Sequence, residues 1–302
     1  MNPDLFIGVV TYPGTRFPES SGSKGLAQSL ARGIEASNGT CVVEIHGQDV
    51  YKPSLLTIDQ EEISKSIDAE LATELEWRRH VTGTNFHPIA ATKLKVHRSL
   101  RRKKFLTADD DSDPVESAGF RMVRRLVNIE FAHLTLMRNA LNAGAAWILI
   151  IEDDAAIDQE LLSVEELAKS LVEFGERAAF TSTPSFVNIS RSHSDSELGT
   201  ARIYVDQAEW APKSSPDIRA QVAERPVTNT VCAILYRREF LAGLLDEMTR
   251  IPLSPVLPID WKLNQALMNM TKRNEIGLGS CWSLSPAPIV QGSMHTTGGA
   301  EA

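Results

Sequence analysis

Three consecutive carboxylates, Glu152, Asp153 and Asp154, are the residues of this sequence best suited to chemistry. They directly follow an apolar run from Trp147 to Ile151. A carboxylate buried without a partner is unstable or becomes protonated, so the three acids must lie at an edge where loops and ligands gather. Their hard oxygen atoms suit Mg²⁺ or Mn²⁺. The alternative is a solvated strand end, or the first turn of the next helix, which favours acidic residues.

The segments before this block predict the elements that position it. A short apolar run without alternation, such as 147–151, is typical of a strand that is buried on both faces. Upstream, apolar residues at helical spacing predict a long helix from Phe120 to Ala143, which Gly144 ends. Glu130 and His133 lie on this helix, and we interpret each as a surface residue or as a polar group at the edge of the core.

The start of the chain, up to Ile45, predicts a βαβ unit. We expect a strand from Leu5 to Thr11, and then a turn at Tyr12-Pro13-Gly14-Thr15-Arg16 because of its Pro-Gly pair. A helix from Leu26 to Ile34 and a strand from Cys41 to Ile45 complete the unit. Such a unit begins many nucleotide-binding α/β sheets. The connecting loop contains neither GxxxxGK[ST] nor GxGxxG, which excludes a phosphate-binding loop of the ATPase type.

The rest of the chain predicts further helices and strands of the same sheet. From amphipathic spacing and short apolar runs we expect helices at 161–174 and 237–249, and strands at 179–183, 186–189, 203–205 and 230–236. Asp260 follows a proline-rich segment and stands at a helix start, where a carboxylate is structurally favoured. We therefore predict an α/β fold in one domain, residues 1–295, with a helical, charged insertion at about 50–119 and a flexible tail at 296–302.

Composition restricts the function classes. The 302 residues carry a formal net charge of −8, which argues against nucleic acid as a partner, because phosphate binding depends on an excess of Lys and Arg. The three cysteines are far apart, so we expect neither a disulfide framework nor a zinc site. We expect a cytoplasmic protein, because the sequence begins without a signal peptide pattern and no apolar run approaches the roughly 20 residues of a membrane span.

A basic stretch from Lys93 to Lys104 allows two interpretations. A run of charges is usually a solvated surface. The alternative is a basic lip that binds an anionic substrate or the acidic inner face of a membrane. The sequence alone leaves both open.

Several motifs occur in an order typical of one enzyme family. The first is the helix with the step Ala132-His133, followed by the strand that closes in Glu-Asp-Asp-Ala at 152–155. The others are Phe6–Arg16, Val43–Asp49, 229–241, Pro258-Ile259-Asp260-Trp261 and Pro288-Ile289-Val290-Gln291. Together they resemble glycosyltransferase family 25, the lipooligosaccharide and collagen galactosyltransferase type. The likeness spans most of the chain, whereas 50–119 departs from the family and leaves the acceptor open.

This resemblance implies a GT-A fold, with a mixed, mainly parallel sheet flanked by helices, and sugar transfer from a nucleotide-sugar donor. We expect a UDP-linked hexose such as galactose as donor, and a hydroxyl of a glycan or another molecule as acceptor. Glu152 and Asp154 would face the metal, Mn²⁺ or Mg²⁺, and the ribose, and Asp153 would be turned aside or directed at the donor sugar. Residues two apart in a strand point to the same side, which places Glu152 and Asp154 together. His295 is expected as a further metal ligand, the alternative being a free side chain near the tail.

The family is inverting, so the resemblance also implies direct attack of the acceptor hydroxyl on the anomeric carbon, assisted by a carboxylate base. Asp260 is the candidate base, and its alternative role is a helix N-cap. Thr11, Tyr12, Pro13 and Arg16 are expected to bind the nucleotide, with Arg16 at a phosphate. Two other classes remain open: a sugar nucleotidyltransferase, which uses a related sheet with metal-binding acids, and a non-catalytic carbohydrate-binding or scaffold protein.

Overall fold

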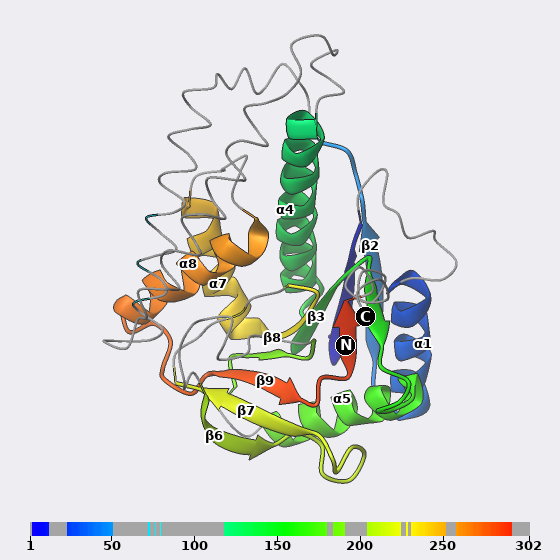
Figure 1. Cartoon of the computed structure of the whole chain (residues 1–302). Helices are drawn as coiled ribbons and strands as arrows, with labels where there is room; N and C mark the ends of the chain where they lie inside the picture. Colours follow the sequence, from blue (N-terminus) through cyan, green and yellow to red (C-terminus); the bar gives the residue numbers. More distant parts are fainter. Residues whose placement is uncertain are drawn as a thin grey trace, which may run out of the picture.

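A computed structural model of the chain describes residues 2–11, 23–50, 118–179, 184–190, 204–224, 231–251 and 258–291, with the single positions 72, 76, 79 and 228. The insertion predicted at 50–119, the strand predicted at 179–183 and the tail at 296–302 lie almost entirely outside these residues. The described part is an α/β structure with one large mixed sheet flanked by helices (Figure 1). The predicted class is confirmed at this level.

One eight-stranded sheet forms the centre of the molecule. Its strands are β1 (Leu5–Val10), β2 (Cys41–His46), β3 (Trp147–Glu152), β5 (Phe186–Asn188), β6 (Tyr204–Glu209), β7 (Arg219–Ala223), β8 (Ala233–Arg237) and β9 (Cys281–Ser285). Their order across the sheet is β2-β1-β3-β8-β5-β9-β7-β6. β1 is parallel to β2 and β3, and β5 is parallel to β9. β8 is antiparallel to β3 and β5, and β7 is antiparallel to β9 and β6, so β7 and β8 run against all the other strands.

The first βαβ unit forms as predicted. β1 leads through the helix α1 (Ser23–Ala36) to β2, which pairs with β1 in parallel along its whole length. Leu26, Leu30 and Ile34 are buried, at the spacing that gives a helix one apolar side. Asn38 follows the helix with a φ of 65°, a left-handed conformation that Asn adopts more readily than most residues.

The long helix α4 (Ala118–Ala143) carries the chain from the edge of the sheet to its centre. β1 lies between β2 and β3 in the sheet, and α4 packs across all three strands. Gly144, with a φ of 76°, ends the helix, and the chain turns into β3. A side chain at Gly8 of β1 would meet Ile150 at 2.8 Å and Leu136 of α4 at 3.3 Å, so glycine here permits close packing of helix on sheet.

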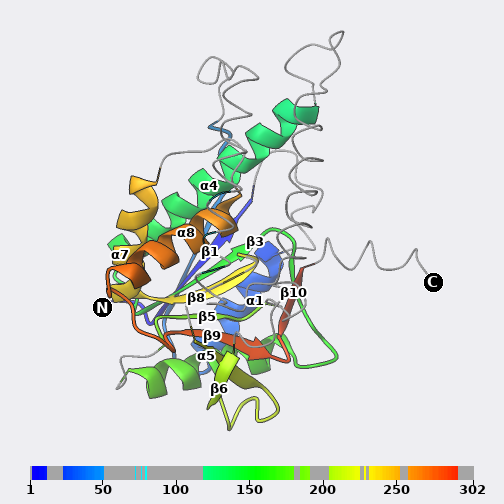
Figure 2. The same ribbon diagram turned by 60° about the vertical axis from the view of Figure 1, so that its left-hand side comes forward.

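Helices cover both faces of the sheet (Figure 1 and Figure 2). α4, α7 (Arg238–Arg250) and α8 (Ile259–Lys272) lie on one face, against Phe6, Val10, Ile148 and Ile150 of β1 and β3. α1 and α5 (Val164–Ala178) lie on the other face, against the alternate residues of the same strands. Burial on both faces explains why these two strands are apolar until Glu152.

A second, two-stranded sheet stands beyond the end of β3. β4 (Ala155–Ile157) directly follows the acid block and pairs antiparallel with β10 (Ile289–Gln291), with Ala155 opposite Gln291. Ile289 also forms a bridge with Ser190, just after β5. The late segment that ends at Gln291 is thereby joined to the residue after Asp154.

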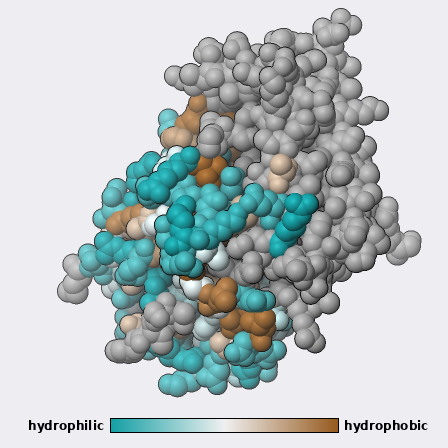
Figure 3. All heavy atoms as spheres, turned by 90° about the vertical axis from the view of Figure 1, so that its left-hand side faces the viewer, coloured by the Kyte–Doolittle hydropathy of each residue, from teal (hydrophilic) through white to brown (hydrophobic). Residues whose placement is uncertain are grey.

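On the face shown in Figure 3, the described residues are mainly hydrophilic, with hydrophobic side chains in small separate patches. Within the described ranges, the large exposed hydrophobic side chains are Val42, Ile45, Phe131, Val205 and Leu278. They are distributed over β2, α4, β6 and the loop before β9. None of the helices in the described ranges is both long and apolar enough to span a membrane.

Candidate functional site

The acid block stands at the carboxyl end of β3. Glu152 is the last residue of β3 and lies opposite Val10, the last residue of β1. Thr11 follows Val10, so Thr11 and the acid block are neighbours at the carboxyl ends of the adjacent strands β1 and β3. The backbone N–H of Glu152 donates to the carbonyl of Cys232, 2.8 Å away, just before β8. β1, β3 and β8 therefore all contribute to the position of the block.

The carboxyl ends of β1 and β3 also lie at the topological switch point of the sheet. From β1 the chain passes through α1 to β2 on one side, and it later passes through α4 to β3 on the other side. α1 and α4 lie on opposite faces. In open α/β sheets, ligands bind outside the carboxyl ends of the strands at such a point. Thr11 and the acid block border it.

The loop after β2 is held close to Thr11. A Cβ atom at Gly47 would lie 2.4 Å from Cγ2 of Thr11, so glycine alone permits this approach. Two residues later, Asp49 accepts hydrogen bonds from Arg124 Nε at 3.0 Å and from Asn128 Nδ2 at 2.9 Å, both on α4. The loop is thus fixed on one side by contact with Thr11 and on the other side by α4.

The charges of all three carboxylates act on one buried thiol, that of Cys232. Asp154 is buried, whereas Glu152 and Asp153 are half-buried. The pKa of the Cys232 thiol lies well above its ordinary value, first because of burial and then because of the negative charges of Glu152, Asp154 and Asp153. All three charges therefore act on the same point at the end of β3.

The turn after β3 differs from the predicted geometry. β3 ends at Glu152, and Asp153 and Asp154 form the turn into β4. Side-chain alternation, which predicts Glu152 and Asp154 on one side, applies only while the strand continues. The turn, and not the alternation of a strand, therefore directs the Asp154 carboxylate.

A row of buried polar side chains leads from Glu152 into the helical layer. His133 of α4 is 1% exposed and places Nε2 3.6 Å from Oε1 of Glu152. One turn earlier, Glu130 forms a buried ion pair with Lys262 of α8. Burial raises the pKa of Glu130, while the hydrogen bond and charge of Lys262, and then the charge of His133, act in the opposite direction. Glu130 and His133, which we interpreted from the sequence as surface or core-edge groups, are both buried. Lys262 was not predicted as a site residue.

Asp260 is half-buried in the first turn of α8. Pro258 occupies the N-cap position, so the alternative role predicted for Asp260, a helix N-cap, is wrong. A carboxylate in the first turn still interacts favourably with the helix dipole. Lys262 of the same helix pairs with Glu130 of α4, whose pKa also responds to the charge of His133, the neighbour of Glu152.

A second buried polar network borders the site beside β5. Asn264 of α8 accepts a hydrogen bond from the N–H of Thr228 at 2.9 Å and donates to its carbonyl at 2.5 Å. Asn188, the last residue of β5, donates to Thr228 Oγ1 at 2.8 Å and accepts from Ser190 Oγ at 2.8 Å. Ser190 Oγ in turn accepts from the N–H of Ala233 at 3.3 Å. The network ties α8 to the ends of β5 and β8.

Four predicted site residues, Tyr12, Pro13, Arg16 and His295, lie outside the described ranges, as does the basic stretch 93–104. The first three lie within the five residues after Thr11. His295 comes four positions after Gln291, which lies opposite Ala155 in the small sheet. The roles assigned to these four residues stay predictions.

The donor atoms at the acid block fit a hard cation. Among the described side chains, no group of three or more His, Cys, Asp or Glu is arranged to hold a metal ion. Mg²⁺ is usually held by one or two protein carboxylates, by water and by substrate phosphates, and seldom by a complete protein cage. Glu152 and Asp154 are such carboxylates, so their donor chemistry fits a hard cation such as Mg²⁺ or Mn²⁺.

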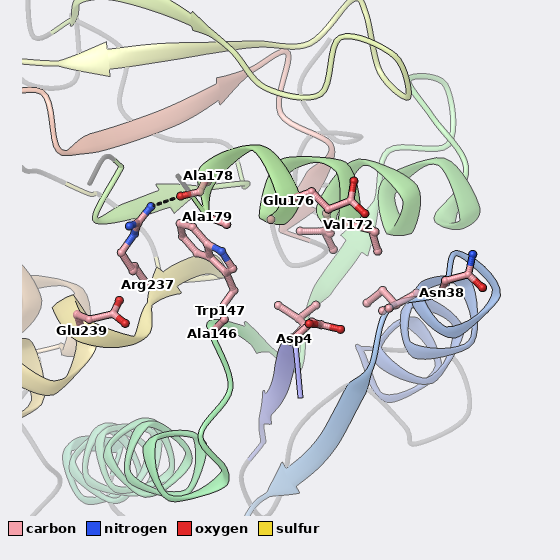
Figure 4. Close-up of a pocket in the computed structure, with 15 residues that line it drawn as sticks. Asp4, Asn38, Ala146, Trp147, Val172, Glu176, Ala178, Ala179, Arg237 and Glu239 are labelled. Atoms are coloured by element: carbon pink, nitrogen blue, oxygen red, sulfur yellow. Dashed lines mark hydrogen bonds between the residues drawn. The ribbon is translucent and has the colours of Figure 1, made fainter. Parts of the chain in front are cut away.

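A cavity of about 490 Å³ lies at the opposite end of the central strands, where β1 and β3 begin (Figure 4). Asp4 and Trp147, at the amino ends of β1 and β3, border it together with Glu176 of α5. Arg237, also at its wall, donates to the carbonyl of Ala178 at 2.8 Å. The length of β3, about 20 Å, separates this cavity from the acid block. Because ligands of open α/β sheets bind at the carboxyl ends of the strands, the acid block is the candidate site.

Neither the protein-family models nor the curated proteins contain a match to this chain. The resemblance to glycosyltransferase family 25 therefore rests on the ordered motifs of the sequence. A function for the chain has to be argued from those motifs and from the geometry at the end of β3.

Proposed function

We propose that this chain is a metal-dependent, inverting glycosyltransferase with a GT-A fold. The observation that carries the proposal is the position of Glu152-Asp153-Asp154 at the carboxyl end of β3, beside Thr11 and at the switch point of the sheet. A βαβ unit, a switch point and a block of acids with donor atoms for a metal ion together suit the binding of a nucleotide sugar. A mixed sheet with helices on both faces is compatible with a GT-A fold.

In this proposal the donor is a nucleotide sugar, such as a UDP-linked hexose, and it lies against the end of β1. Thr11, Tyr12, Pro13 and Arg16 bind the nucleotide, and the Arg16 guanidinium pairs with a phosphate. Asp153 faces the donor sugar. The loop held at Gly47 and Asp49 keeps Thr11 in place from the other side.

Glu152 and Asp154, with His295, hold Mn²⁺ or Mg²⁺ in this proposal. When bound there, the ion would supply positive charge against the diphosphate leaving group. The three carboxylates also keep the site negative before the ion binds, which favours a cation over an anion there.

Asp260 is the proposed base for the acceptor, a hydroxyl of a glycan or another molecule. Its carboxylate takes the hydroxyl proton while the hydroxyl oxygen attacks the anomeric carbon on the face opposite the diphosphate, which inverts that centre. The first turn of α8 favours negative charge on this side chain. The buried ion pair of Lys262 with Glu130 of α4 fixes α8, the helix that carries Asp260.

The direct test is release of nucleoside diphosphate from UDP-, GDP- and CDP-sugars by the full chain with Mn²⁺. We expect turnover that requires the ion and is lost in Asp154→Asn. Asp246→Asn makes the same change at an exposed side chain of α7, which is paired with Arg250 and has no role in the proposed chemistry, and should retain activity. Absence of transfer and hydrolysis with all three donor classes would count against the proposal, and pyrophosphate release from a free nucleoside triphosphate would favour a nucleotidyltransferase.

A further inference from the structure

His133 is a buried polar residue whose presence the packing of α4 does not explain. Only 1% of the residue is exposed, and neither ring nitrogen has a hydrogen-bond partner among the described residues. A buried donor or acceptor without a partner costs about 1–3 kcal/mol. An apolar side chain at this position would avoid that cost, so the histidine calls for a role outside packing.

The His133 ring lies next to the acid block. Its Nε2 is 3.6 Å from Oε1 of Glu152, which is within the range of an ion pair and longer than a hydrogen bond. The backbone of Glu152 is fixed by β1 on one side and by its hydrogen bond to Cys232 on the other. The Glu152 carboxylate, 17% exposed, is therefore the part that has to be oriented. Hydrogen bonds at active sites are often long before the substrate binds and shorten when it does.

A second carboxylate on α4, that of Glu130, is already paired. Glu130 lies one turn before His133 on the same face of α4, and it is paired with Lys262 of α8. The influence of Lys262 on the pKa of Glu130 exceeds that of His133. Because Lys262 satisfies Glu130, a ring N–H of His133 remains available to Glu152.

We propose that His133 is a positioning residue, whose Nε2–H donates to Oε1 of Glu152 and holds that carboxylate in the orientation that binds the metal. This inference rests on the proposed function, since it assigns a supporting partner to one of the proposed metal ligands. Carboxylates that bind metals are commonly held by hydrogen bonds from neighbouring residues, and loss of such a partner lowers metal affinity 10- to 100-fold. His133 supplies this support from α4, and the pair of Glu130 and Lys262 holds α4 against α8 behind it.

The test is the Mn²⁺ affinity of the full chain, measured by titration calorimetry with and without UDP and so independent of turnover. His133→Leu removes the N–H and should raise the Mn²⁺ dissociation constant about 10- to 100-fold. His133→Gln carries an amide nitrogen as many bonds from Cα as Nε2 and should stay close to the wild type. The shorter His133→Asn should lose affinity as the leucine variant does. His46→Leu, at the end of β2, is the matched control for loss of a histidine and, in the titration without UDP, should bind Mn²⁺ as the wild type does.

The outcomes separate this inference from the proposed function. Equal Mn²⁺ affinity in the wild type and in folded His133→Leu overturns the positioning role and leaves the proposed function standing. Affinity that falls equally in the Leu, Gln and Asn variants also overturns it, because a purely structural role explains that result. If His133→Leu does not fold, the Gln and Asn variants decide, and equal affinity in these two overturns the role. A wild type that binds no Mn²⁺, with or without UDP, overturns both proposals.

Discussion

Lys262→Met should strongly destabilise the protein, because the ion pair of Lys262 with Glu130 is buried. The two side chains are 3% and 4% exposed, so the value of about 0–1 kcal/mol for a surface pair does not apply. Methionine keeps the aliphatic stem of lysine but leaves the Glu130 carboxylate buried without its cation. Removal of one partner of a buried pair costs about 3–5 kcal/mol. That is a large share of the roughly 5–15 kcal/mol by which native proteins are stable.

The size of this loss depends on pH in a direction set by Glu130. Burial already raises the pKa of Glu130 in the wild type, and loss of Lys262 removes the main influence that lowers it. A carboxyl group whose pKa is raised on folding contributes its full stability below the unfolded pKa, and loses that contribution as pH rises through the folded pKa. Lys262→Met should therefore be closest to the wild type at about pH 5 and furthest from it at about pH 8.

Urea unfolding followed by circular dichroism at these two pH values measures the loss. Glu130→Leu combined with Lys262→Met is the matched control, because it removes both charges and leaves an apolar pair. This double variant should recover most of the lost stability. A loss below about 1 kcal/mol at the higher pH, or a loss that shrinks as pH rises, would refute the reasoning from a buried pair.

Three more outcomes are expected, two for stability and one for the acid block. Asn264→Ala should lower the unfolding free energy by about 2–4 kcal/mol in urea titrations, because it leaves the N–H and carbonyl of the buried Thr228 without their partner. Gly33→Ala should lower the melting temperature, because its Cβ would lie 2.6 Å from a side chain of α5, whereas Gly25→Ala, in open space on the same helix, should raise stability by up to about 1 kcal/mol. Asp154→Asn should abolish metal-dependent turnover without lowering the melting temperature, since it removes one of three crowded negative charges, and full activity at low metal concentration would contradict the ligand role.

Apolar periodicity was sufficient for elements that are buried on a whole face. The predictions at 5–11, 120–143 and 147–151 correspond to β1, α4 and β3 within a few residues. α5 begins at Val164 and not at 161, because Ser163 and Glu166 form a capping box. That Ser-x-x-Glu signature was readable from the sequence alone.

Strands that depend on distant partners were not predicted. β7 (Arg219–Ala223) and β9 (Cys281–Ser285) contain mainly small or polar residues and lack a clear apolar pattern. β9 pairs with β5 and β7, which both lie far before it in the sequence. β7 pairs with β9 on one side and, on the other side, with β6, the element directly before it. Strand propensity depends on such neighbours, so a local pattern does not contain this information.

The candidate site was predictable only in part. Parallel strands end at the same edge of a sheet, so Thr11 and the acid block could be placed together from β1 and β3. The burial of His133 and Lys262 could not, because it depends on the packing of α8 on α4, which are far apart in the sequence. The available signal was a polar pair, Glu130 and His133, at helical spacing on an otherwise apolar side of α4.

The most direct measurement of the central claim is thermal unfolding of the full chain with nucleotide sugars, each with and without Mn²⁺. A ligand that binds only the native state stabilises it by about 2.7 kcal/mol at a concentration of 100 times its dissociation constant. We predict a rise in melting temperature with at least one nucleotide sugar that requires Mn²⁺ and is absent in Asp154→Asn. No rise with any UDP-, GDP- or CDP-sugar in the presence of Mn²⁺ would contradict a metal-dependent donor site at the end of β3.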